Sequence, residues 1–153
     1  MGAFSLMREN VYGFLVMCAV LIINIYGYFR QGTVYLAFKQ LRTGDHVKAT
    51  ETLALTKRVN WLSKTQQAYY HFVKGYLEMA KGHVDTAKEA FLESVNIGLR
   101  IQNDQAMAYA NLATLYHRTK NKVKAREFLA KTNSLKVKKQ TKKELERLDA
   151  MIN

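Results

Sequence analysis

Residues 75–94, GYLEMAKGHVDTAKEAFLES, decide the fold of this chain because their spacing occurs three times. In this copy Ala87 follows Gly75 by twelve residues. The bulky Phe91 comes four residues after Ala87, and Ser94 comes three residues after Phe91. The same order recurs 38 positions earlier and 38 positions later, at Ala37, Ala49, Leu53 and Thr56, and at Ala113, Ala125, Leu129 and Thr132. A fixed period of about 20–50 residues is the signature of stacked repeats, in which no unit buries its apolar face alone.

This spacing predicts pairs of antiparallel helices, because small residues let two backbones approach while the bulky residue fills the space between them. The chain contains no proline, so no ring clash or missing donor interrupts long helices. Gly44 and Gly82 are expected to turn the first two pairs, and Lys120-Asn121 takes their place in the third. Helix caps are expected at Ser63, at either Asn103 or Asp104, and at Thr141.

An uncharged run, VYGFLVMCAVLIINIYGYF, occupies residues 11–29. About 20 apolar residues in a helix cross a hydrocarbon core of about 30 Å. Tyr12, Tyr26 and Tyr28 fall near its ends, where amphipathic rings favour the membrane interface. The run therefore predicts a single transmembrane helix. A cleaved signal peptide is the alternative, but its apolar region would be shorter and followed by a small-x-small site.

Lysine and arginine prefer the cytoplasmic side of a span. Basic residues are denser after the run, at Arg30, Lys39, Arg42 and Lys48, than before it. This bias predicts a cytoplasmic helical domain on a single-pass protein, which we place in a bacterial inner membrane. Asn24, inside the run, either bonds to a neighbouring helix or reaches the headgroups.

At the repeated residues the chain resembles the tetratricopeptide repeat family. That family has a small residue in the first helix, a glycine turn seven residues on, then an alanine, an aromatic and a small residue. The second copy matches this pattern at Gly75, Gly82, Ala87, Phe91 and Ser94. The resemblance covers about residues 31–137, and it departs from the family in its period of 38 in place of the commoner 34. An irregular helical bundle is the alternative.

The expected fold class is therefore all-α, with one N-terminal transmembrane helix, a solenoid of three helix pairs and a C-terminal capping helix. The expected domains are residues 1–30, 31–140 and 141–153. A capping helix with a polar outer face suits the end of a solenoid, which needs one for solubility.

The resemblance implies that the first helix of each pair lines a concave surface that binds another polypeptide. The expected contact residues are Phe38, Arg42, Tyr69, Phe72, Tyr76, Met79, His117 and Arg118. An aromatic surface of this kind suits an amphipathic helix or an extended apolar segment. The alternative is that these aromatic side chains pack between repeats or against the anchor helix.

The formal charge of +12 is concentrated near the C-terminus: residues 118–143 contain eleven Lys or Arg, and Glu127 is their only acid. Such a stretch lies on anionic lipid, contacts a partner, or is simply solvated. Nucleic acid is the least favoured ligand, because Phe128 is the only aromatic residue in the stretch.

Catalytic patterns are missing from the sequence. The four histidines show no metal-ligand spacing, the single Cys18 allows no disulfide within the chain, and there is no phosphate loop or nucleophile elbow. We therefore expect no enzyme activity, cofactor or metal. The sequence predicts a membrane-anchored adaptor or scaffold that binds a protein partner, as an accessory or assembly subunit of a membrane complex. The alternatives are a receptor that captures amphipathic targeting segments, and a ribosome-binding or nucleic-acid-binding membrane tether.

Overall fold

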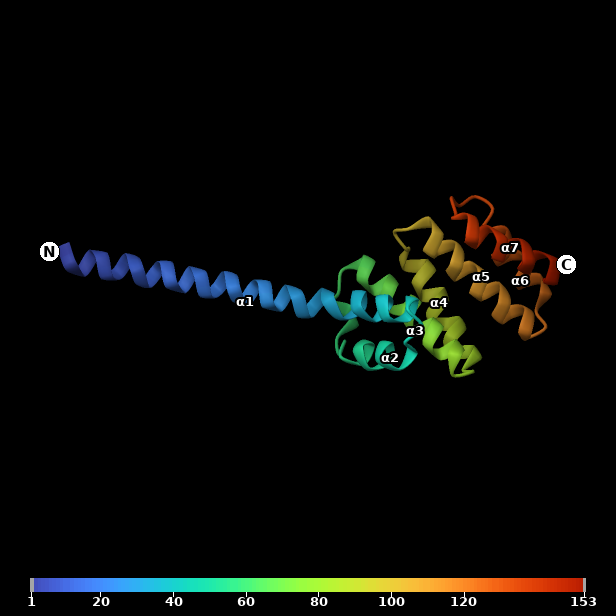
Figure 1. The fold of residues 1–153 in the computed structure, drawn as a ribbon, viewed down its shortest axis with the longest axis horizontal. Helices are drawn as coiled ribbons and strands as arrows, with labels where there is room; N and C mark the ends of the chain where they lie inside the picture. The colour runs from blue at the N-terminus through green and yellow to red at the C-terminus, as the bar shows by residue number, and fades with distance from the viewer. Residues whose placement is uncertain (1, 153) are drawn as a thin grey trace.

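Helices make up the secondary structure of the described chain in the computed structural model (Figure 1). The structure describes the backbone of residues 2–152 and the side chains of residues 11–24, 27 and 32–152. The elements are α1 (Gly2–Arg42), α2 (His46–Ala54), η1 (Val59–Trp61), α3 (Lys64–Ala80), α4 (Val84–Ile97), α5 (Gln102–Arg118), α6 (Lys122–Ala130) and α7 (Lys139–Ile152). The all-α expectation is confirmed, since no strand occurs among the described residues.

The first helix does not end where the predicted anchor ends. α1 continues without a break through residue 30, so the first helix of the first pair is the last part of a helix of 41 residues. Among the residues that the structure describes, no helix combines the length and the apolar character needed to cross a bilayer. Tyr26 and Tyr28, two of the predicted interface residues, lie outside the described side chains.

Three helix pairs follow one another, as the spacing predicts: α1 with α2, α3 with α4, and α5 with α6 (Figure 1). Each pair turns through one residue of positive φ, namely Gly44 at +82°, Gly82 at +84° and Lys120 at +60°. Lysine therefore adopts in the third pair a conformation that glycine adopts without steric cost. Side chains cap the helices that follow two of these turns. Asp45 accepts the backbone N–H of Lys48 at the start of α2, and Asn121 accepts that of Lys124 at the start of α6.

Ser63 caps α3 as predicted, because its hydroxyl accepts the backbone N–H of Gln66 at 3.4 Å. The predicted caps of α5 and α7 are wrong. α5 begins at Gln102 after Ile101, which makes no side-chain cap, and α7 begins at Lys139, ahead of Thr141. For α5 the reason is physical, since the Asn103 and Asp104 side chains bond to other parts of the chain.

The repeated residues form the core. Ala37, Ala49, Ala87, Ala113 and Ala125 are fully buried, and the bulky Leu53, Phe91 and Leu129 are nearly so. Gly75 marks a close approach of α3 and α4, since a Cβ atom there would lie 2.9 Å from three ring carbons of Phe91. The position that pairs with phenylalanine is glycine, whereas the positions that pair with leucine are alanine. The pair volume is therefore kept nearly constant along the solenoid.

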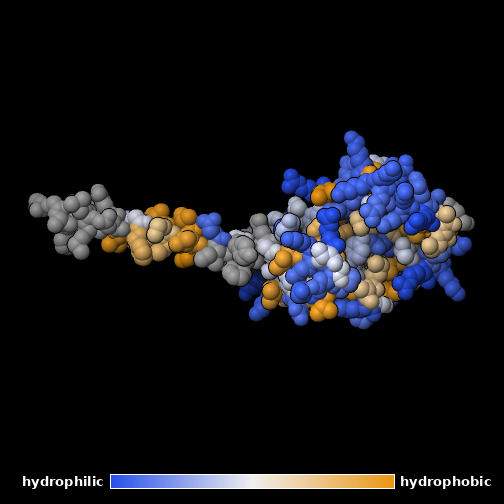
Figure 2. Space-filling model, viewed as in Figure 1, coloured by the Kyte–Doolittle hydropathy of each residue, from blue (hydrophilic) through white to orange (hydrophobic). Residues whose placement is uncertain are grey.

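The helix pairs stack in chain order, and α7 packs on α5 and α6 at the far end, as expected of a capping helix. The N-terminal part of α1 extends away from this helical body in the opposite direction (Figure 1). Figure 2 shows its apolar side chains outside the body, whereas hydrophilic residues cover much of the end formed by α5, α6 and α7.

Candidate partner-binding groove

A cavity of about 520 Å³ opens where all three helix pairs meet. The C-terminal end of α1, the middle of α3 and the start of α5 form its sides, and Lys138 with the first turns of α7 closes it. Four of the eight predicted contact residues line it: Phe38, Arg42, Phe72 and Tyr76. We call this cavity the groove.

Aromatic side chains form the floor of the groove. The Phe72 ring lies 6.0 Å from the Phe38 ring and 5.1 Å from the Tyr76 ring, measured between centroids. Tyr69 lies beside them, with its ring centroid 5.2 Å from that of Phe38. Phe72 is only 2% exposed and also packs against Phe91, so it belongs to the core and supports the floor from below. For Phe72 the alternative of packing between repeats therefore holds.

Charged side chains of both signs line the rim. The Arg42 guanidinium lies 5.8 Å from the centre of the Phe38 ring, within the range of a cation–π contact. Lys138 adds a second positive charge, while Asp104 and Glu144 add negative charges. The Asp104 carboxylate accepts a hydrogen bond from the Tyr69 hydroxyl at 2.8 Å. The sequence predicts an aromatic contact surface that includes Arg42, and the structure adds Lys138, Asp104 and Glu144 to its rim.

The wall of the groove that includes Lys138 is held in place by side chains of α5. Gln102 Oε1 accepts the backbone N–H of Lys136 at 2.8 Å, and Asn103 Oδ1 accepts that of Lys138 at 2.9 Å. These bonds fold the segment between α6 and α7 back over the start of α5. Sequence reasoning missed this wall because the segment lies outside the repeats, and because Asn103 reads equally well as a helix cap.

The two tyrosines at the groove remain protonated well above neutral pH. Burial raises the pKa of Tyr76 to about 12. Burial, reinforced by the hydrogen bond to Asp104, raises the pKa of Tyr69 as well. Both hydroxyls therefore act as hydrogen-bond donors near neutral pH, and Tyr69 already uses its proton inside the protein.

The other three predicted contact residues lie outside the groove. Met79 is half-buried against the core. His117 and Arg118 lie at the C-terminal end of α5, whereas the groove opens at its N-terminal end. Arg118 is exposed, and His117 Nδ1 is buried without a hydrogen-bond partner among the described residues.

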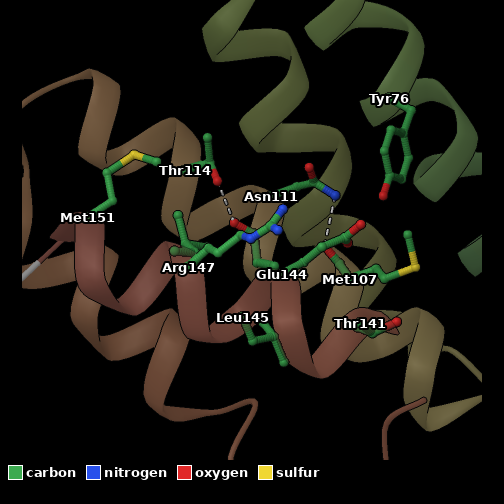
Figure 3. Close-up of a pocket in the computed structure, with 11 residues that line it drawn as sticks. Tyr76, Met107, Asn111, Thr114, Thr141, Glu144, Leu145, Arg147 and Met151 are labelled. Atoms are coloured by element: carbon green, nitrogen blue, oxygen red, sulfur yellow. Dashed lines mark hydrogen bonds between the residues drawn. The ribbon is translucent and has the colours of Figure 1, made fainter. Parts of the chain in front are cut away.

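A second, smaller cavity of about 270 Å³ separates α5 from α7 (Figure 3). It shares Tyr76, Met107, Thr141 and Glu144 with the groove. Two polar residues facing it bond to their own helix: Asn111 donates to the Met107 carbonyl at 2.8 Å, and Thr114 donates to the Ala110 carbonyl at 2.9 Å. The cavity is therefore an extension of the groove under the capping helix.

The described residues contain no group of three His, Cys, Asp or Glu placed to hold a metal ion. Comparison of the chain with protein-family models, curated proteins and solved structures gives no match. The resemblance to the tetratricopeptide repeat family thus stays a prediction, and function is inferred from the geometry.

Proposed function

We propose that this chain is a membrane-anchored helical-repeat adaptor that holds a segment of a protein partner in the groove. The observation that carries the proposal is the cavity of about 520 Å³ at the junction of the three helix pairs. Its size falls within the range of about 300–1,000 Å³ of typical ligand sites. Its aromatic floor and charged rim suit the binding of a polypeptide segment.

The groove fits a partner segment of mixed character. An apolar side chain of the partner would reach the rings of Phe38 and Tyr76 on the floor, because burial of such an anchor contributes most of the affinity at protein interfaces. Arg42 and Lys138 would meet acidic or carbonyl groups, and Glu144 would meet a basic group. An amphipathic helix with both charge signs meets these conditions.

Exposed apolar side chains of α1 support the membrane anchor. The large apolar residues between Val11 and Ile23 are 51–68% exposed, and residues 11–24 carry no charge. Those 14 residues alone would span about 21 Å, whereas the whole uncharged run to residue 29 would span about 28 Å. The latter length is close to a hydrocarbon core of about 30 Å.

Asn24 fits an apolar environment better than its side chain suggests. Its amide donates a hydrogen bond to the Val20 carbonyl at 2.7 Å, within the same helix. This internal bond lowers the cost of burying the amide in lipid without requiring a partner helix. The basic residues that follow the run favour a cytoplasmic helical domain on this single-pass protein, which we place in a bacterial inner membrane.

Site-specific photocrosslinking in native membranes tests the groove. A crosslinking amino acid placed at Arg42 or Gln140, both exposed and lining the groove, should give one adduct of the same mass from both positions. The matched control is Glu89, an exposed residue on α4 outside the groove. Adducts that are equally abundant from Glu89, or missing from both groove positions, would reject the proposal. Resistance of the chain to alkaline carbonate extraction tests the anchor separately.

The basic stretch supports a second candidate, a membrane tether for a polyanion such as ribosomal RNA. Its lysines and arginines are exposed, and Lys131 pairs with Glu127 at 2.9 Å. The stretch lies at the end of the body opposite the extended part of α1 (Figure 1). Binding of RNA that falls steeply with added salt would favour this candidate, and salt-independent binding would reject it.

A further inference from the structure

Large exposed apolar side chains gather where α1 leaves the helical body. Tyr35 on α1 is 67% exposed, Leu55 after α2 is 68% exposed, and Trp61 in η1 is 52% exposed. The segment of residues 55–61 that joins α2 to α3 lies at the end of the body from which α1 extends (Figure 1). We call Tyr35 and residues 55–61 the collar.

One hydrogen bond fixes the position of the collar along α1. The hydroxyls of Thr33 and Thr56 lie 2.9 Å apart, so the start of the segment is level with Thr33. Thr33 lies four residues beyond residue 29, the last of the uncharged run, which corresponds to about 6 Å along a helix. The headgroup layer on each side of a bilayer is about 5–8 Å thick.

The chemistry of the collar fits this layer. The Arg58 guanidinium lies 4.4 Å from the centre of the Trp61 ring, so a cation and an amphipathic ring are presented together. Lys57 is exposed next to them. Tryptophan and tyrosine concentrate at the membrane interface, and each lysine or arginine near an anionic surface adds about 1 kcal/mol.

We propose that the collar lies in the anionic headgroup layer of the membrane that α1 enters and thereby fixes the helical body against the bilayer. This inference rests on the proposed anchor. The segment of residues 55–61 lies at the end of the body where α1 leaves it, whereas the basic stretch of residues 118–143 lies at the opposite end (Figure 1). With α1 across a flat bilayer, the collar contacts lipid and the groove and the basic stretch face the aqueous phase.

Trp61 is the only tryptophan of the chain, so its fluorescence reports on the collar without a label. The full chain is reconstituted into phosphatidylcholine vesicles, with and without phosphatidylglycerol, that carry spin-labelled lipid with the label at a shallow or a deep position. We expect blue-shifted emission, protection from aqueous iodide, and stronger quenching by the shallow label than by the deep one. Changing Lys57 and Arg58 to Glu should remove the additional blue shift caused by phosphatidylglycerol.

The matched control moves the tryptophan to the other end of the body. In the double variant Trp61→Phe/Val123→Trp the probe occupies an exposed apolar position on α6, where iodide and not lipid should quench it. Flotation of the vesicles in a density gradient reports membrane association separately. If the chain floats with the vesicles but Trp61 is quenched by iodide alone, the headgroup position of the collar is refuted and the anchor stands. Protection from both quenchers would indicate a protein on the collar and would also overturn the inference. A chain that fails to float would overturn the anchor and the collar together.

Discussion

The repeat packing is tested by changing the sizes of two residues in contact, Gly75 on α3 and Phe91 on α4. A Cβ atom on Gly75 would lie 2.9 Å from ring carbons of Phe91, closer than real contacts allow. Overpacking of this kind costs about 1–3 kcal/mol. Replacing glycine by alanine inside a helix returns about 1 kcal/mol. Gly75→Ala should therefore lower the free energy of unfolding by about 0–2 kcal/mol.

The companion change, Phe91→Leu, reproduces the residue at this position in the other two repeats. It removes ring contacts to Phe72 and Tyr76, whose centroids lie 6.0 and 5.3 Å from that of Phe91. Together with the cavity left behind, this loss should cost about 1–3 kcal/mol. In the double variant the methyl group added at position 75 enters the space that the ring vacated, so the two costs should not add.

The assay is urea unfolding of the full chain in mild detergent, followed by helical circular dichroism. We expect the double variant to be about 1–2 kcal/mol more stable than the sum of the single changes predicts. The reverse exchange, Ala113→Gly with Leu129→Phe, is the matched control and should show coupling of the same sign. Simple additivity at Gly75 and Phe91 would refute the idea that each pair keeps its combined volume.

Three further predictions follow from single residues, each measured by urea unfolding. Lys120→Gly should raise the free energy of unfolding by about 0.5–1 kcal/mol, because it relieves a side chain at φ +60°; no gain would show that this turn is unstrained. Burial raises the pKa of Tyr76 to about 12, so its contribution to stability is present below the unfolded value near 10 and is lost as pH rises toward 12. Tyr76→Phe should flatten that alkaline decline, and an unchanged decline would contradict the assignment. Hydrogen bonds from His83 and Lys81 lower the pKa of Glu78, so its contribution is present above the ordinary carboxyl pKa of 4.5 and is lost as pH falls through the lowered value. Glu78→Gln should be less stable than the natural protein at neutral pH, with a difference that disappears in acid; a constant difference would contradict this cause.

The sequence predicts the helix pairs well because each signal is local and occurs three times. Gly44 and Gly82 occupy the turns they were expected to occupy, and the small residues at the repeated positions are buried except for Thr56, which is half-buried. The continuity of α1 could not be predicted in the same way. No helix-breaking residue separates the uncharged run from residue 31. The change from apolar to mixed composition there predicts the end of one helix and the start of another, but the backbone continues as one helix.

The groove was predicted only on the side that the repeats build. Phe38, Arg42 and Tyr76 follow from the register of the first helices, whereas Lys138 and Glu144 arrive through a segment with no repeat counterpart. That segment is positioned by side-chain amides accepting backbone N–H groups, and such bonds leave no periodic trace in a sequence. His117 lies at the end of α5 opposite the groove, and helix periodicity identifies the face of α5 but not which end of it is open. Its role as a contact residue stays a prediction.

Tyr69 explains why the groove depends on all three helix pairs. Its ring packs on Phe38 of the first pair, it belongs to α3 of the second, and its hydroxyl donates to Asp104 of the third. In a solenoid each unit packs mainly on its neighbours, so the position of the first pair relative to the third is set by the second pair. Loss of stacking at either junction would therefore open the cavity. Under the proposed function, a partner bound there would stabilise the stacked state by mass action, so partner binding and completion of the solenoid would be one coupled equilibrium.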